Sequence, residues 1–206
     1  RGVRWLLERL IAREWRPYRE GQYPIAAKAA GAWVTLEPGA QFELSGAPHR
    51  TITEVHREAQ EFNELIDDLL AGTGTRQVAM GFTPFARIAD VPFVPKGRYA
   101  IMSAHLGQTG SLAHHMMKGT AATQASYDFS SEVDCAAKVR LSTYLGPLTT
   151  AMFANSPIAE GRLTPWRSYR GHIWTQTDPA RTGFPTAAAT ARPSSSAKGS
   201  REVTAR

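Results

Sequence analysis

Residues 25–45, IAAKAAGAWVTLEPGAQFELS, decide the fold expected of this chain. Two short apolar segments, Ile25–Lys28 and Trp33–Leu36, flank a small-residue turn at Gly31, which is typical of a β-hairpin. A Pro-Gly pair then interrupts the chain, and alternation of apolar and polar residues resumes over Gln41–Ser45. The stretch therefore predicts an antiparallel hairpin followed by a third strand.

Helices are expected on both sides of this stretch. Apolar residues recur every three or four positions over residues 2–15 and again from about residue 51 to residue 70, which is typical of amphipathic helices. Thr51 or Thr53 can cap the second of these helices, because a threonine hydroxyl accepts a hydrogen bond from a free amide of the first turn.

The second half of the chain mixes short elements. The pattern predicts strands at Val78–Phe82, Thr120–Phe129 and around His172–Thr175, and helices at Tyr99–His105, Ser111–Met117 and from Ser131 to near Asn155. Ser131 with Asp134 three residues on resembles a capping box, and Pro147 is expected to kink or interrupt that helix. This irregular order of helices and antiparallel strands predicts the α+β class.

Composition limits the class of protein. Of the 206 residues 42% are hydrophobic and 20% are charged, so a domain over residues 1–183 can bury a core. No apolar run approaches the ~18 residues of a membrane span, so no membrane is expected as a partner. Cys135 is the single cysteine, which excludes an internal disulfide and favours a reducing, cytoplasmic location.

Residues 184–206 differ from the rest. They are almost all Ala, Thr, Ser, Pro and Arg, which cannot build a core, so a low-complexity, disordered tail is expected. About half of the net charge of +6 lies in this tail. The other basic residues are scattered among acids and form no run with aromatics, so nucleic acid is not an expected partner.

Three polar residues beside the Pro-Gly turn form the first candidate site. Gln41 and Glu43 are two apart on an expected strand and leave the same face, and Glu37 precedes the turn. Hard oxygen ligands on one face suit Mg²⁺, which takes one or two carboxylates and leaves other positions to water and phosphate. Spacing alone favours the simpler interpretation, an ordinary solvated strand face.

Basic side chains supply the other candidates. Lys96 and Arg98 bracket a glycine where a helix is expected to begin, so they could form an anion site or merely a basic loop. Further along, arginines can grip an oxyanion with two parallel hydrogen bonds beside a flat indole wall. The candidates there are Arg170, Arg181 and Trp174, together with Asn155, which could equally be a helix C-cap.

Other reactive side chains have plainer explanations. His114 and His115 are adjacent, so on a helix they point about 100° apart and do not readily chelate one metal. Cys135 is expected to be a buried thiol. The sequence contains no phosphate-binding loop of the G-x-x-x-x-G-K-[ST] type, no G-x-G-x-x-G and no G-x-S-x-G elbow.

Five strings, in this order, resemble one family. They are EPGAQFELSGAP (37–48), PKGRYAIM (95–102), TAATQASYDFSSEVD (120–134), FANSP (153–157) and SYRGHIWTQTDPARTG (168–183). Together they are similar to the plant-type glutamate–cysteine ligases, which include many bacterial enzymes, and the resemblance covers about residues 2–183. It implies a glutamine-synthetase-like fold with a curved antiparallel sheet backed by helices.

The resemblance also implies a reaction. Such enzymes join the γ-carboxylate of glutamate to the amino group of cysteine through a γ-glutamyl phosphate, consuming ATP with Mg²⁺, to open glutathione or ergothioneine synthesis. Under it, Glu37, Gln41 and Glu43 line the metal and phosphate face. Lys96, Arg98, Asn155, Arg170, Trp174 and Arg181 are the candidates for substrate and ATP binding, with Arg98, Arg170 and Arg181 also as catalytic candidates.

The chain departs from the family pattern at three places. Ala40 replaces the usual second glycine of the turn, the acidic strand G-x-E-x-E-x-F that normally precedes these strings is missing, and the tail replaces an apolar stretch after Gly183. A fragment, incomplete at both ends, is therefore expected. Two alternatives remain open: a catalytically inactive fragment that binds glutamate or ATP, and a γ-glutamyl ligase with another amine acceptor. The oligomeric state is not indicated.

Overall fold

The computed structural model describes residues 2–39 and 41–183. The first half contains, in order, α1 (Val3–Ile11), β1 (Arg16–Glu20), β2 (Tyr23–Ala29), β3 (Ala32–Leu36), β4 (Phe42–Ser45) and α2 (Ile52–Leu70). The second half contains the 3₁₀ turn η1 (Ile88–Asp90), α3 (Gly97–Thr109), α4 (Ala113–Gly119), α5 (Glu132–Met152), β5 (Ile158–Ala159), β6 (Arg162–Leu163) and α6 (Tyr169–Thr175). The expected tail and Ala40 lie outside the described residues.

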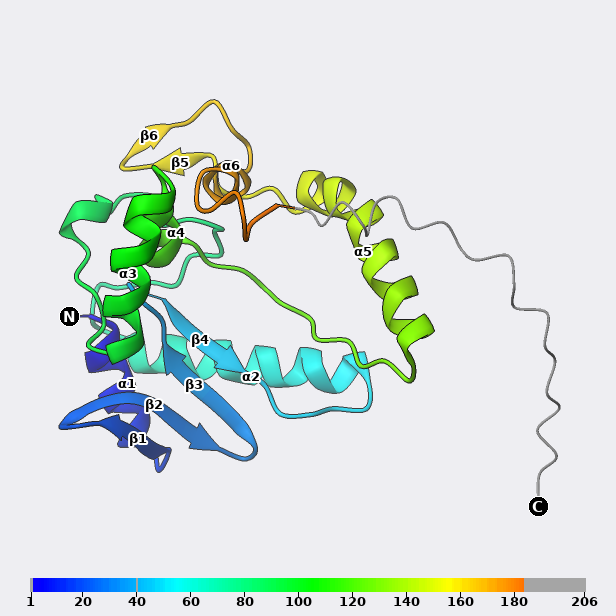
Figure 1. Cartoon of the computed structure of the whole chain (residues 1–206). Helices are drawn as coiled ribbons and strands as arrows, with labels where there is room; N and C mark the ends of the chain where they lie inside the picture. The colour runs from blue at the N-terminus through cyan, green and yellow to red at the C-terminus, as the bar shows by residue number, and fades with distance from the viewer. Residues whose placement is uncertain (1, 40, 184–206) are drawn as a thin grey trace, which may run out of the picture.

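An antiparallel sheet of four strands, in the order β1-β2-β3-β4, organises the first half (Figure 1). The hairpin between β2 and β3 turns at Ala30 and Gly31, with φ of 46° and 88°, as a two-residue turn matching the strand twist requires. The expected hairpin, third strand and α+β class are confirmed. Strand β1 was not expected, since its five residues are all exposed and show no alternation.

One face of the sheet carries the main core. Val34 and Leu36 of β3 pack against Leu7 and Leu10 of α1 and against Leu69 of α2, and all five side chains are at most 2% exposed. Because side chains alternate along a strand, the residues between these point to the opposite face of the sheet. The core therefore leaves one face of β3 and β4 free for polar side chains.

The cap of α2 resolves one open alternative. The Thr51 hydroxyl accepts from the Glu54 amide at 3.3 Å, and the Glu54 carboxylate accepts from the Thr51 amide at 2.9 Å. This reciprocal pair is a capping box, so Thr51 and not Thr53 begins the helix.

Three expected elements in the second half are wrong. Thr120–Phe129 forms no strand: only Thr120 pairs, in an isolated bridge with Phe82, and the segment beyond is exposed. The same bridge is all that forms of the strand expected at Val78–Phe82. His172–Thr175 lies in helix α6. Alternation in a short segment predicts a strand only where a neighbouring strand accepts its hydrogen bonds, and beyond this one bridge the described residues offer the first two segments no such neighbour.

Helix α5 behaves differently from the others. The Ser131 hydroxyl caps it by accepting from the Asp134 amide at 3.2 Å, as expected. The interruption expected at Pro147 is wrong, because the helix continues through this residue to Met152. It has no buried residue and lies apart from the sheet in Figure 1. No helix in the described part of the chain is long and apolar enough to cross a membrane.

Candidate functional site

Two carboxylates meet on the polar face of the sheet, opposite α1 and α2. Glu43 of β4 pairs with Thr35 of β3, and the Thr35 hydroxyl donates to Glu37 Oε1 at 3.0 Å. Thr35 thus links the two glutamates, because it hydrogen-bonds to Glu37 and lies opposite Glu43 on the neighbouring strand. The structure brings Glu37 and Glu43 together, as their spacing suggested.

The electrostatics of this pair suit a divalent cation. Burial first, and then the negative charge of Glu37, raise the pKa of Glu43 above its ordinary value. A bound cation would relieve both effects. The described residues contain no cluster of three or more His, Cys, Asp or Glu arranged to hold a metal. Two carboxylates nevertheless fit Mg²⁺, which fills its remaining positions with water and phosphate oxygens.

Gln41 is held by three hydrogen bonds. Its Oε1 accepts from the Gly39 amide at 2.9 Å, and its Nε2 donates to the carbonyls of Met117 and Thr120 at 3.0 and 3.1 Å. These bonds tie the Pro-Gly turn to the end of α4. The approach is close, because a Cβ on Gly39 would collide with the backbone of Lys118. A role for Gln41 as a metal ligand stays a prediction.

Cations surround the two carboxylates. The side chain of Lys96 is buried, its Nζ donates to the Leu36 carbonyl, and burial lowers its pKa. Arg98, by contrast, leaves 62% of its side chain exposed, and its Nη2 lies 3.8 Å from Glu37 Oε1. Lys96 is thus a fixed charge beneath the site, whereas Arg98 is free to contact an anion arriving from solvent.

Tyr99 completes this cluster, and the sequence reasoning missed it. Its ring is 2% exposed, and its hydroxyl accepts from Arg98 Nη2 at 2.9 Å and lies 3.3 Å from Glu37 Oε2. The sequence signal for Tyr99 was its position directly after Lys96-Gly-Arg98. The first turn of α3 brings the side chains of Lys96, Arg98 and Tyr99 to the same end of the helix.

A second cluster of candidates forms where α6 meets the segment that follows α5. Asn155 Nδ2 donates to the Ala79 carbonyl, so Asn155 is not a helix C-cap, and α5 ends at Met152. A Cβ on Gly81 would lie 2.8 Å from Asn155 Oδ1 and 3.5 Å from Arg170 Cδ. Asn155 and Arg170 therefore line the same stretch of backbone.

Unpartnered donors mark this cluster. Arg170 Nε and Trp174 Nε1 are buried and lack a hydrogen-bond partner among the described residues. The Arg170 guanidinium lies 5.8 Å from the Trp174 ring centre, and burial lowers its pKa. Buried donors without acceptors are unfavourable in a finished fold, so an acceptor from a ligand or from further protein would complete the cluster.

Arg181 lies elsewhere. Its Nη1 contacts Asp178 Oδ2 at 2.6 Å, and this aspartate also receives the Ala180 amide. The hydrogen bond from Arg181 is the largest cause that holds the pKa of Asp178 below its ordinary value, and it outweighs burial, which acts in the opposite direction. The structure therefore gives Arg181 an internal partner, and its catalytic and substrate-binding roles stay predictions.

A short segment after α4 joins the two clusters. Thr120 accepts from Gln41 through its carbonyl, and the next amide, that of Ala121, donates to the Gly81 carbonyl at 3.1 Å. The carboxylate cluster on the sheet and the Arg170 cluster therefore lie on either side of Thr120–Ala121.

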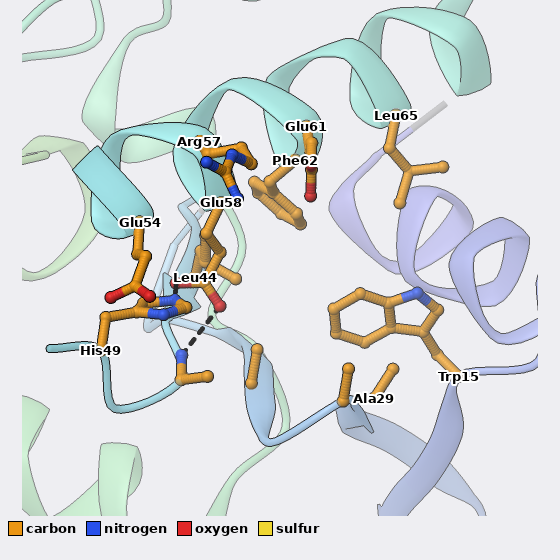
Figure 2. A pocket seen from close by; sticks show the side chains of 13 residues that line it. Trp15, Ala29, Leu44, His49, Glu54, Arg57, Glu58, Glu61, Phe62 and Leu65 are labelled. Atoms are coloured by element: carbon orange, nitrogen blue, oxygen red, sulfur yellow. Dashed lines mark hydrogen bonds and ion pairs between the residues drawn. The ribbon is translucent and has the colours of Figure 1, made fainter. Parts of the chain in front are cut away.

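A cavity of about 530 Å³ opens on the other face of the sheet, under α2 (Figure 2). Two of its carboxylates already serve the fold: Glu58 accepts from the Ala47 amide at 2.8 Å and contacts His49 Nε2 at 3.1 Å, and Glu54 belongs to the capping box. Since none of the site candidates line it, we do not assign it a part in the chemistry.

The histidines keep their plainer explanation, whereas the burial expected of Cys135 is wrong, because α5 buries none of its residues. His114 Nε2 lies 3.0 Å from the Ser103 hydroxyl, whereas His115 stacks on Phe82, so the two rings face different neighbours. Cys135 lies on α5 as a free, half-buried thiol.

Comparison with known proteins gives consistent matches. A model of glutamate–cysteine ligase family 2 (GCS2) matches residues 3–197. Over 175 residues the chain is 42% identical to a chloroplastic glutamate–cysteine ligase of Brassica juncea and 41% identical to one of Arabidopsis thaliana, covering 83% of this chain and 33% of each relative. It is 39% identical over 187 residues to glutamate–cysteine ligase A, chloroplastic, of Oryza sativa subsp. japonica, covering 88% of this chain and 37% of that protein. The chain thus spans about a third of the length of these curated relatives.

Proposed function

Since the chain belongs to glutamate–cysteine ligase family 2, we propose that it forms part of an enzyme that joins the γ-carboxylate of glutamate to the amino group of cysteine with consumption of ATP. The observation that carries this proposal is the cluster of Glu37, Glu43, Lys96 and Arg98, which sets carboxylates for a cation beside an exposed guanidinium for an anion.

The chemistry explains why both charges are needed. A carboxylate is a poor acylating agent, so the γ-carboxylate first attacks the terminal phosphorus of ATP and releases ADP. The cysteine amine then attacks the resulting γ-glutamyl phosphate, loses a proton and releases phosphate. Phosphoryl transfer depends on positioning and on offsetting the charge of the transferred group.

The described residues divide this work. Arg98, exposed beside the carboxylates, contacts the transferred phosphoryl group, while the buried charge of Lys96 holds the last residue of β3, Leu36, in place beneath it. Arg170 and Trp174 offer their unpartnered donors to the carboxylate of an amino-acid substrate or to ATP, and Asn155 lines the same stretch. Glu37 and Glu43 would hold Mg²⁺, which would offset the negative charge of the phosphates.

The resemblance extends this proposal beyond the described residues. We expect the four strands to be part of a larger, glutamine-synthetase-like curved sheet, and the reaction to open glutathione or ergothioneine synthesis. A single cysteine suits a reducing compartment such as the cytoplasm.

The test is ADP release coupled to a spectrophotometric assay, with glutamate, cysteine, ATP and Mg²⁺, and mass detection of γ-glutamylcysteine. It is run on the full gene product and on these 206 residues, for which we expect little turnover because they span a third of the relatives. Glu43→Ala should abolish turnover, Arg170→Ala should impair it, and His114→Ala is the matched control. Full-length protein that makes no γ-glutamylcysteine, or that ligates another amine faster, would overturn the assignment.

A further inference from the structure

The hydroxyl of Tyr99 occupies the space between the cation and the anion of the site. It lies 2.9 Å from Arg98 Nη2 and 3.3 Å from Glu37 Oε2, while Arg98 and Glu37 themselves stay 3.8 Å apart at their nearest atoms. A guanidinium and a carboxylate in direct hydrogen bond approach to about 2.7–2.9 Å. The phenol therefore stands where a direct ion pair would otherwise form.

The hydroxyl has the bonding capacity for this position. A phenol has one proton to donate and two lone pairs to accept with. The lone pairs face Arg98 Nη2 at 2.9 Å and Lys96 Nζ at 3.4 Å, and the proton faces Glu37 Oε2 and the Leu36 carbonyl, each at 3.3 Å. Among the described side chains, Tyr99 alone forms hydrogen bonds with both Arg98 and Glu37.

The ring fixes the hydroxyl in place. Tyr99 is 2% exposed and belongs to the main core, and the charges of Lys96 and Arg98 lie 5.3 and 4.8 Å from its ring centre. A hydroxyl on a buried ring cannot follow a moving side chain. Arg98, with 62% of its side chain exposed, is the mobile partner of the two.

We propose that Tyr99 is a positioning residue that keeps Arg98 from pairing directly with Glu37, so that the carboxylate stays available to a divalent cation and the guanidinium to an anion. This rests on the proposed function, in which Glu37 and Arg98 have those two roles. Without the hydroxyl, Arg98 closes on Glu37, and each neutralises the charge that the other needs for binding.

The variant Tyr99→Phe removes only the hydroxyl, and Tyr169→Phe is the matched control, because burial and the charge of Glu160, with no hydrogen bond from the described residues, set the environment of the Tyr169 hydroxyl. The first readout needs no ligand. In a crystal structure of metal-free Tyr99→Phe, the nearest Arg98–Glu37 distance should fall from 3.8 Å to about 2.8 Å. A separation that stays at 3.8 Å or widens would overturn the proposal.

The second readout is the affinity for Mn²⁺ alone, measured by calorimetry as a double-mutant cycle with Arg98→Gln. Tyr99→Phe should weaken Mn²⁺ binding about tenfold, as the loss of a residue supporting a metal ligand typically does. In the Arg98→Gln background the same change should have little effect, because no guanidinium remains to close on Glu37. An equal loss in both backgrounds would show a merely structural role and refute the proposal.

The two readouts separate the possible failures. If the distance closes in Tyr99→Phe but the unaltered protein binds no Mn²⁺, the metal role of Glu37 in the proposed function is wrong and the spacer role of Tyr99 stands. If the unaltered protein binds Mn²⁺ but the Arg98–Glu37 distance does not shorten in Tyr99→Phe, the spacer role of Tyr99 is wrong and the metal role of Glu37 stands. Tyr169→Phe should change neither measurement. If it changed either one as much as Tyr99→Phe does, the effect would not be specific to the Tyr99 hydroxyl and the proposal would be wrong.

Discussion

Replacing Gln41 by alanine tests whether this side chain ties the Pro-Gly turn to α4. The change removes three hydrogen bonds, those with the Gly39 amide and with the carbonyls of Met117 and Thr120. Each neutral hydrogen bond contributes about 1 kcal/mol net, and partners left buried without water lose more. Because these groups are half-buried, some water reaches them, and we expect a loss of about 2–3 kcal/mol in the free energy of unfolding.

The assay is urea unfolding at 25 °C in metal-free buffer, followed by circular dichroism. Gln60→Ala, at an exposed position of α2, is the matched control and should stay within about 0.5 kcal/mol of the unaltered protein. If Gln41 served only as a metal ligand, its removal would leave the metal-free stability unchanged. A loss below about 1 kcal/mol for Gln41→Ala, at an unchanged slope with urea, would refute the tether.

Three further expectations follow from the packing and charges. Thr51→Ala should lower the free energy of unfolding by about 1 kcal/mol, while Thr53→Ala should change it by less than half of that, because only Thr51 caps α2; urea unfolding of both variants decides this. Gly110→Ala should destabilise by at least about 2 kcal/mol, since a Cβ there collides with the backbone carbonyl of Thr177, and an unchanged melting temperature would contradict the close approach. Glu43→Gln should raise the melting temperature at pH 7 without metal: the raised pKa of Glu43 means that its ionisation opposes folding, and this penalty appears as the pH rises through the unfolded and then the folded pKa. The gain should vanish near pH 3, where the carboxyl is protonated in both states, and a gain of equal size at both values would assign it to packing.

The sequence predicted correctly those elements that a few neighbouring residues determine. The turn at Gly31 needs a positive φ, and the cap at Thr51 needs a hydroxyl followed by a glutamate, so both are written in a few neighbouring residues. The expected strand over Thr120–Phe129 failed for the opposite reason. Alternation there describes a segment that could pair, but pairing depends on a neighbour far away in the chain, and beyond the bridge at Thr120 none is present.

Position 172–175 shows a second limit. His-Ile-Trp-Thr is short, aromatic and β-branched, which suits a strand, yet it forms the last turn of α6 with Ile173 fully buried. A short apolar run has no period to separate helix from strand. The Ser168 hydroxyl, which accepts from the Gly171 amide at 3.2 Å, is the start signal that would have corrected the assignment.

The candidate site was predictable in its residue types but not in its grouping. Glu37 and Glu43 are close in sequence, and register alone brings them together across β3 and β4. Their meeting with Lys96 and Arg98 depends on where α3 packs, which no local pattern gives. Tyr99 was missed because a tyrosine in the first turn of a helix is ordinary in sequence, and only its burial beside two cations makes it distinctive.

The exposure of helix α5 determines how soon its backbone hydrogen bonds open. It has no buried residue, whereas Ile66, Leu69 and Leu70 anchor α2 in the core. Pro147 has no amide, so the Thr143 carbonyl lacks its usual partner four residues on, and the bonds that tie the helix to its surroundings are exposed: its cap at Ser131 and the bonds from Lys138 Nζ to the Asp128 carbonyl and to Asp134 Oδ2. Amide hydrogens of α5 should therefore exchange with deuterium through local opening, orders of magnitude sooner than those around Ile66, which wait for global unfolding.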